Sequence, residues 1–164
     1  YPFKYGFDEQ VADKFHLQRV TLQGTLITRE NKVMIEALPE SVMASAGPPV
    51  RGHPLGPEVT LGETTLRGEI VDSKCYLGVM NPGNLKTHRA CAVNCIAGGI
   101  PPVLLVRSET GEARYVLLVG EQGEAVNEKV LPLVAEPVAV PGRLVRQGEQ
   151  LILFAKPAQI ELLE

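Results

Sequence analysis

The sequence of 164 residues contains no tryptophan, and aromatic residues make up only 5% of it. Surfaces that stack bases or sugars depend on aromatic rings, so this scarcity argues against such a surface. Basic residues are not in excess either, with 16 Lys and Arg against 19 Asp and Glu and a net charge of -3. Because a basic stripe is missing, we expect no nucleic acid as a main partner.

Long apolar runs are also missing, since none reaches the roughly 18 residues that a transmembrane helix needs. The longest, around residues 101–106 and 115–119, have the length of strands. We therefore expect no membrane span in this segment. The chain begins at Tyr1 rather than Met, as a processed or trimmed envelope protein does. We expect an extracytoplasmic protein, in the periplasm or at the cell surface, anchored through residues before Tyr1.

What is present favours a mainly β fold. Alternating apolar residues predict strands over 64–72, 102–108, 113–119, 137–146 and 150–155, and helical spacing predicts a helix over 125–135. Glycines at the centre of the first and fourth strands, Gly68 and Gly142, are typical of sharp bends in small barrels. Five short strands with one helix before the last hairpin resemble an oligonucleotide/oligosaccharide-binding (OB) Greek-key barrel, a likeness of fold that carries no function.

The pattern divides the chain into three parts. Residues 1–38 contain an aromatic opening and two strands, around 20–27 and 33–36, and form an N-terminal β-hairpin arm. Residues 39–62 are rich in Pro and Gly and predict an extended linker. Residues 63–164 form the barrel. Because a lone hairpin is marginal in water, we expect the arm to pack on the barrel or on a protein partner.

All three cysteines lie within 21 residues, at positions 75, 91 and 95. A turn over residues 81–84 precedes Thr87, a good N-cap, and Gly98 and Gly99 provide a stop. The interval predicts a short helix over residues 88–97. At about 100° per residue, His88, Cys91 and Cys95 fall on one helical face. Cys75 ends a strand, and the intervening loop can return it over that face.

Three interpretations of this cluster stay open. In the first, Cys75, His88, Cys91 and Cys95 form a Cys₃His shell for zinc, with Met80 as an outside ligand that would also suit copper. In the second, Cys75 forms a disulfide with Cys91 or Cys95, which leaves one thiol beside His88. A Cys91–Cys95 bond is excluded because i, i+4 Cβ atoms are about 5–6 Å apart. In the third, the cysteines only fill a core.

The same face could also carry a catalytic pair, with Cys91 or Cys95 as nucleophile and His88 as base. No acidic residue that would orient the imidazole is evident, although Asp72 lies just before Cys75. The sequence therefore leaves enzymatic activity undecided, and we lean towards no enzymatic turnover.

The cysteine segment resembles an uncharacterised family of bacterial envelope proteins. The residues that carry the resemblance are 71–80, 88–92 and 98–102, about a quarter of the chain. The resemblance implies a location in the envelope and no specific activity. Together these observations predict an extracytoplasmic metal-binding or redox accessory module that uses the Cys₃His cluster. The alternative is a structural or interaction subunit of a membrane-anchored envelope assembly, braced by a Cys75 disulfide.

Overall fold

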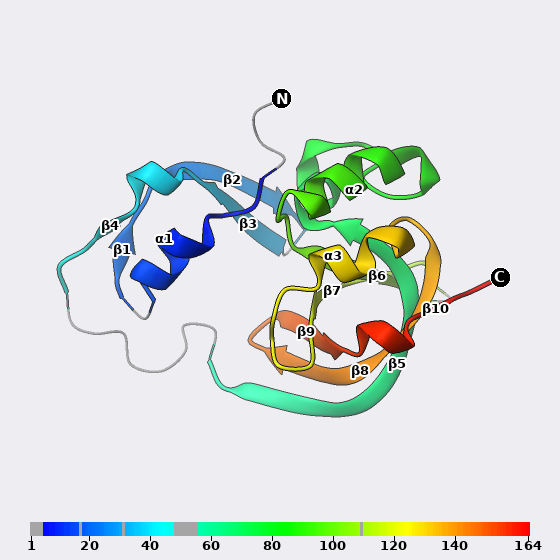
Figure 1. The fold of residues 1–164 in the computed structure, drawn as a ribbon. Coiled ribbons are helices and arrows are strands. Elements are labelled where there is room, and N and C mark those ends of the chain that lie inside the picture. Colours follow the sequence, from blue (N-terminus) through cyan, green and yellow to red (C-terminus); the bar gives the residue numbers. More distant parts are fainter. Residues whose placement is uncertain (1–4, 17, 31, 48–55, 109) are drawn as a thin grey trace.

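A computed structural model describes residues 5–16, 18–30, 32–47, 56–108 and 110–164 of the chain (Figure 1). Its largest element is a six-stranded sheet in the order β10–β8–β5–β6–β7–β9, and a further pairing of β8 with β9 closes five strands into a barrel. The strands are β5 (Glu58–Asp72), β6 (Pro102–Arg107), β7 (Ala113–Val119), β8 (Pro137–Gln147), β9 (Gln150–Ala155) and the short β10 (Glu161–Leu162).

The strand pairing has the order of an OB-like Greek key. Strand β5 is antiparallel to β6 and β8, β6 is antiparallel to β7, and β7 runs parallel to β9. After β7 the chain crosses to β8, which pairs with β5 on the edge opposite β6. Strand β9 then pairs with both β8 and β7 and closes the barrel. The small OB-like barrel predicted from the sequence is confirmed.

The two central glycines stand where strands of the barrel approach closely. A Cβ atom at Gly68 would lie 2.5 Å from the carbonyl oxygen of Leu105. One at Gly142 would lie 2.4 Å from the carbonyl oxygen of Phe154. Only glycine fits at these points of close backbone approach, as the sequence pattern predicted.

Short helices interrupt the barrel at two crossings and cover its core. Between β5 and β6 lie a π-type turn η2 (Cys75–Val79), a 3₁₀ turn η3 (Lys86–His88) and α2 (Arg89–Ala97). Between β7 and β8 lie α3 (Asn127–Val130) and the 3₁₀ turn η4 (Leu131–Leu133), and η5 (Pro157–Gln159) precedes β10. The main core joins Ile96 of α2 and Val130 of α3 to buried residues of the strands, among them Ile70, Leu104 and Val138.

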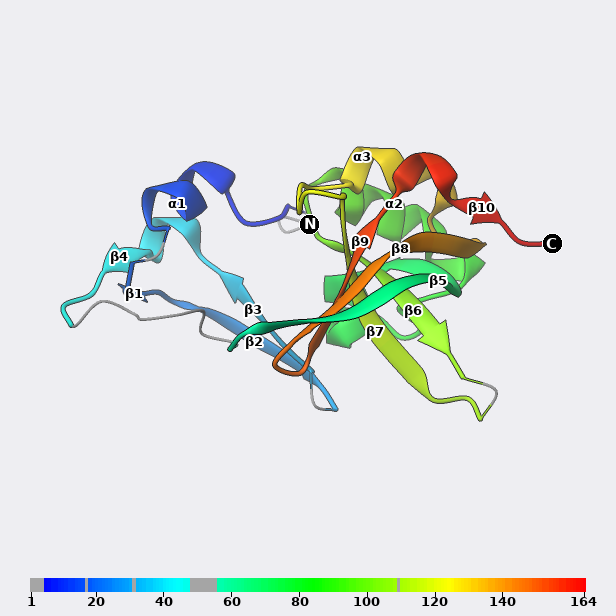
Figure 2. The same cartoon turned by 90° about the horizontal axis from the view of Figure 1, so that it is seen from below.

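The N-terminal arm lies to one side of the barrel in both views (Figure 1 and Figure 2). It contains α1 (Glu9–Lys14), β1 (Val20–Thr21), β2 (Gly24–Arg29), β3 (Lys32–Ala37), η1 (Pro39–Ser41) and β4 (Met43–Ala44). Strands β2 and β3 form an antiparallel hairpin, and β1 pairs with β4.

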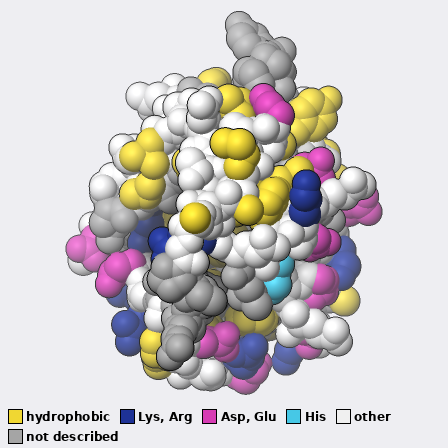
Figure 3. All heavy atoms as spheres, turned by 90° about the vertical axis from the view of Figure 1, so that its left-hand side faces the viewer, with side chains coloured by type: hydrophobic (Ala, Val, Ile, Leu, Met, Phe, Trp, Pro, Cys, Tyr) yellow, Lys and Arg dark blue, Asp and Glu magenta, His cyan; other side chains and the backbone are white. Residues whose placement is uncertain are grey.

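The two faces of the β2–β3 hairpin differ in exposure. Ile27 is 8% exposed and pairs with Met34, on the face that also carries Arg29 and Glu36. On the opposite face Leu26 and Val33 are more than 60% exposed. Figure 3 shows hydrophobic side chains at the surface on this side of the molecule. Strand alternation therefore turns one row of the hairpin towards the barrel and the other row to solvent.

Several local predictions need correction. The first strand was expected to run unbroken through Gly24, but residues 20–21 pair with β4 and β2 begins at Gly24. Helix α3 covers only Asn127–Val130, and the chain tightens into a 3₁₀ turn at Pro132, which lacks the amide that α-helical pairing needs. Helix α1 was not predicted.

The proposed division into arm, linker and barrel stays a prediction. Strand β4 and the first residues of β5 fall inside the interval 39–62 that was expected to be linker. The Pro- and Gly-rich residues 48–55 lie outside the described part of the chain.

Candidate metal centre

Cys75 is positioned by the end of β5. Asp72, the last residue of that strand, is fully buried, and its Oδ1 accepts a hydrogen bond from the Cys75 amide at 2.7 Å. A carboxylate that accepts from a nearby downstream amide reverses the chain locally. The strand therefore ends in η2, and this turn places the Cys75 thiol, 4% exposed as a residue, over the barrel end.

Helix α2 presents the other two thiols. Cys91 is half-buried and Cys95 is buried, and both belong to a small cluster with Cys75 and Ile100. The predicted helix is confirmed and ends at Gly98. Its expected N-cap is wrong, because His88 rather than Thr87 occupies the N-cap position, without a side-chain capping bond. The preceding 3₁₀ turn η3 leads the chain into the helix instead.

Contacts with the segment after β7 hold α2 in place. The side-chain Nδ2 of Asn127 donates to the carbonyl oxygens of Ile96 at 2.8 Å and Ile100 at 3.0 Å. Arg89 forms an ion pair with Glu136, and a second nitrogen of its guanidinium donates to the carbonyl of Pro132 at 3.0 Å. These bonds satisfy carbonyl groups at the end of the helix and fix its position against the barrel.

The three sulfur atoms are spaced like ligands of one ion. Cys75 Sγ lies 3.8 Å from Cys91 Sγ and 4.0 Å from Cys95 Sγ, and all three lie within 4.8 Å of one another. Two thiolates bound to zinc at about 2.3 Å and at the tetrahedral angle are about 3.8 Å apart. The sulfurs therefore already stand near the corners of a tetrahedral site and are positioned to hold a metal ion.

His88 belongs to a second group that shares Cys75 with the first. Its Nε2 atom lies 3.0 Å from Oδ2 of Asp72, and both side chains are at most 3% exposed. Asp72, Cys75 and His88 each offer a ligand atom within 4.8 Å of the others. The four ligands predicted from the sequence thus form two overlapping groups joined at Cys75. That His88 completes the thiol shell stays a prediction.

Met80 stands at the edge of this arrangement. It caps the C-terminal end of η2, where its amide donates to the carbonyl of Cys75 at 3.2 Å, and its side chain is 46% exposed. The backbone of Met80 therefore supports the cysteine turn. Its role as an outside sulfur ligand stays a prediction.

Electrostatics keep the buried thiols neutral when no cation is bound. Burial, followed by the nearby charge of Asp72, raises the pKa of Cys75 far above its ordinary value of 9.0. Burial and then the same carboxylate raise the pKa of Cys95 to about 11. A bound cation reverses this balance, because it supplies the positive charge that a buried thiolate lacks.

The same pKa shifts argue against Cys75 and Cys95 as nucleophiles. An activated thiol needs a lowered pKa and access to substrate. The pKa values of Cys75 and Cys95 are raised and both residues are buried. Asp72 contacts the imidazole of His88 as the carboxylate of a catalytic triad does. The thiol that lies near this pair, however, is that of the buried Cys75.

The disulfide alternative is not realised in the structure. All three cysteines are free, and the shortest described sulfur distance is 3.8 Å. A disulfide needs about 2.05 Å. A bond from Cys75 to Cys91 or Cys95 stays a prediction that thiol counting can test.

Asp72 is the residue that the sequence did not place in the site. The sequence showed it just before Cys75, at the end of a predicted strand. In the structure, the loop after Cys75 brings His88 to within hydrogen-bond distance of the Asp72 carboxylate. This contact makes Asp72 part of the site. The spacing Asp72-x-x-Cys75, with a carboxylate three residues before a turn cysteine, was the available signal.

Comparisons with known proteins return no matching family model, no similar curated protein and no similar solved structure. Among the described residues, no helix is long and apolar enough to cross a bilayer. The geometry of the cysteine cluster therefore carries the functional argument.

Proposed function

We propose that the protein is a metal-binding module, with a zinc-type ion held by Cys75, Cys91 and Cys95 and His88 as fourth ligand. The observation that carries the proposal is the sulfur spacing of 3.8 Å and 4.0 Å around Cys75. Three thiolates with one imidazole form an ordinary tetrahedral zinc shell. Soft thiolates also bind Cu(I), and the sulfur of Met80 adds a further soft ligand for that ion.

The donor set fits such an ion in chemistry as well as spacing. Buried thiols cost least to ionise where a cation replaces the lost hydration. A metal-bound imidazole commonly donates its second ring nitrogen to a carboxylate, which fixes its orientation. The contact of His88 Nε2 with Asp72 Oδ2 at 3.0 Å supplies that partner, and Nδ1 would then be the nitrogen that binds the ion. When bound, the ion would hold the β5 end and helix α2 together.

The test is metal content together with a spectrum of the site. Native protein should contain about one zinc or copper ion per chain, whereas Cys75→Ser, Cys91→Ser and Cys95→Ser variants should lose most of it. Co²⁺ titration should produce a thiolate-to-metal charge-transfer band that weakens with each serine. Ser108→Ala, on the exposed turn between β6 and β7, is the control and should bind normally. Native protein without metal, and without any cobalt band, would reject the proposal.

A second candidate function is a structural or interaction subunit braced by a disulfide. The proximity of Cys75 Sγ to two other sulfurs favours it, because a small displacement would allow bonding. Thiol counting on denatured native protein separates the two functions. Three free thiols after chelation fit the metal module, and one free thiol fits the brace.

An extracytoplasmic location, a redox role and attachment to a larger envelope assembly complete the proposal. The resemblance of residues 71–80, 88–92 and 98–102 to envelope proteins supports the location. Fractionation of the source cells, with an antibody against the barrel, tests it. Recovery with cytoplasmic markers alone would contradict an envelope location without affecting the metal site.

A further inference from the structure

The residues on either side of Cys75 are both held by the N-terminal hairpin. On one side, Lys74 forms an ion pair with Glu36 of β3, and the Lys74 side chain is 9% exposed. On the other side, the guanidinium of Arg29, at the end of β2, donates to the carbonyl of Tyr76 at 2.6 Å. The hairpin thus contacts η2 at two points, with Cys75 between them.

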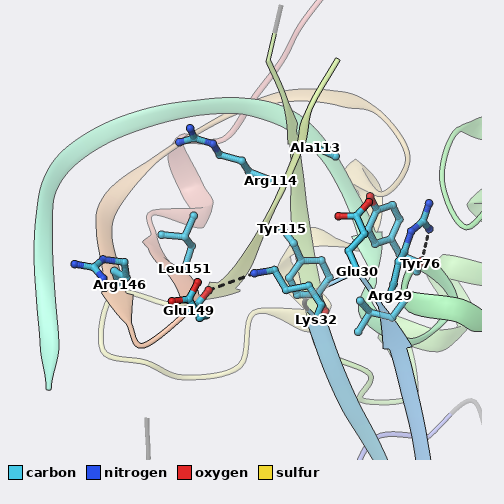
Figure 4. A pocket seen from close by; sticks show the side chains of 11 residues that line it. Arg29, Glu30, Lys32, Tyr76, Ala113, Arg114, Tyr115, Arg146, Glu149 and Leu151 are labelled. Atoms are coloured by element: carbon cyan, nitrogen blue, oxygen red, sulfur yellow. Dashed lines mark hydrogen bonds between the residues drawn. The ribbon is translucent and has the colours of Figure 1, made fainter. Parts of the chain in front are cut away.

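The Arg29 contact has a second component. Its guanidinium carbon lies 4.5 Å from the centroid of the Tyr76 ring, as expected for a cation–π interaction. Figure 4 shows Arg29 against the Tyr76 ring. Both residues line a pocket of about 310 Å³. Tyr76 in turn stacks on Tyr115 of β7, with centroids 6.1 Å apart. One arginine therefore fixes both the backbone and the ring of the residue after Cys75.

Apolar packing connects the same two elements. Ile27 is the buried side chain of β2, and it lies on the face that also bears Arg29. Its Cγ2 atom would lie 3.3 Å from a Cβ atom built on Gly78 of η2. The hairpin and η2 are therefore in close contact at Gly78 as well as at the two polar attachments.

Cys91 and Cys95 depend on different supports. They lie on α2, which is held by Asn127, Arg89 and the barrel core, and at its end by the amide of Gly6, which donates to the carbonyl of Gly98 at 2.7 Å. The β2–β3 hairpin together with Asp72 thus places the sulfur of Cys75, while these other contacts place its two partners. The distances of 3.8 Å and 4.0 Å between these sulfurs depend on how the arm docks.

We infer that Arg29 and Glu36 are positioning residues for the metal centre, so that docking of the hairpin and binding of the ion stabilise one another. The inference rests on the proposed function. Each residue acts through a neighbour of Cys75, and neither is a ligand. Coupling of this kind is reciprocal. The bound ion raises the equilibrium constant for hairpin docking by the same factor by which the docked hairpin raises the affinity for the ion.

The experiment compares the full-length protein with Arg29→Ala and Glu36→Ala variants. Zn²⁺ affinity, measured by competition with a chromophoric chelator, should fall about tenfold or more, as for other residues that orient ligands. The Co²⁺ charge-transfer and ligand-field bands should also shift, because the Cys75 thiolate is displaced. A loss of global stability alone would leave these bands in place.

Arg143→Ala is the matched control. Arg143 of β8 also pairs with a carboxylate, Glu58 at 3.0 Å, and its guanidinium also lies over an aromatic ring, Phe154 at 4.1 Å. Strands β8 and β9 carry none of the proposed ligands. This variant should keep both the zinc affinity and the cobalt spectrum of the wild type.

Conservative variants decide the matter if the alanine variants do not fold. Arg29→Lys keeps the positive charge but loses the planar guanidinium. Glu36→Gln keeps a hydrogen-bond acceptor for Lys74 but loses the negative charge of the carboxylate. Both should give intermediate affinities. In the wild type, Zn²⁺ should slow hydrogen exchange of amides in residues 24–29 and 32–37.

Two results would count against the inference in distinguishable ways. Unchanged affinity and spectrum in the Arg29 and Glu36 variants, with no slowing of exchange in the hairpin, would overturn the coupling while leaving the metal site intact. Failure of the wild type to bind zinc or cobalt, with no difference from Cys75→Ser, would reject the proposed function itself and the coupling with it.

Discussion

His88 and Asp72 form a buried pair, with Nε2 of the imidazole 3.0 Å from Oδ2 of the carboxylate. The other oxygen of Asp72 accepts the amide of Cys75. One carboxylate therefore orients two of the proposed ligands at once, although Asp72 and His88 are sixteen positions apart along the chain. This pairing makes Asp72 the residue on which the geometry of the centre can be tested most directly.

Asp72→Asn should weaken metal binding without removing a ligand. The amide nitrogen of Asn cannot accept from the imidazole, and the neutral group no longer favours the metal-binding tautomer. We expect the Zn²⁺ affinity to fall about tenfold to a hundredfold in chelator competition. Glu63→Gln, an exposed carboxylate of β5, is the control. Equal affinities for Asp72→Asn and wild type would show that the carboxylate does not act on the ligands.

The three thiols should differ in their rate of alkylation in metal-free protein. Cys91 is half-buried, whereas Cys75 and Cys95 are buried with raised pKa values, so few thiolates are exposed there. Peptide mass spectrometry after a short iodoacetamide pulse should find the label mainly on Cys91. Zn²⁺ should protect all three positions. Faster labelling of Cys75 than of Cys91 would contradict the described burial.

The metal-free protein should lose stability at alkaline pH. Burial, aided by Asp72, raises the pKa of Cys95 from 9.0 to about 11, and raises that of Cys75 as well. The native state therefore binds more protons than the unfolded state above about pH 9, and the free energy of unfolding falls as pH rises through this range. Below that pH the contribution is fully present.

Bound Zn²⁺ should remove this alkaline loss, because the metal has already displaced the thiol protons. Urea titrations between pH 8 and 10.5 measure it, with and without metal. Tyr115→Phe should replace the wild type in both series, because burial also raises the pKa of this phenol. Equal pH profiles with and without the ion would contradict the assignment of the effect to the thiols.

The barrel was predictable because its sequence signals are local. Apolar patterns of strand length placed β6, β7, β8 and β9 within one residue of their observed bounds, since each strand buries apolar side chains in the barrel. The central glycines Gly68 and Gly142 were also informative, because the missing Cβ marks close backbone approach. The arm was predicted less well, because two-residue pairings such as β1 with β4 have no periodicity to detect.

The candidate site was predictable only in part for a related reason. Helical spacing placed Cys91 and Cys95 together, since both lie on α2. The partnership of His88 with Asp72 and the attachment of Arg29 to Tyr76 are set by how distant segments meet. Spacing along a single element cannot reveal such contacts, and so the carboxylate and the hairpin were absent from the predicted site.

Asn127→Ala should destabilise the protein and loosen helix α2. The Asn127 side-chain amide donates to the carbonyls of Ile96 and Ile100, just beyond Cys95. Alanine leaves the Ile100 carbonyl without this donor, whereas the Ile96 carbonyl still accepts from the Gly99 amide at 3.0 Å. Unpaired buried acceptors cost about 1–3 kcal/mol, so the free energy of unfolding in urea should fall by about that amount. Asn127→Asp is a stringent companion, because it keeps the size of the side chain but cannot donate when ionised. It should be at least as destabilising, and a neutral effect of both variants would show that α2 does not depend on these bonds.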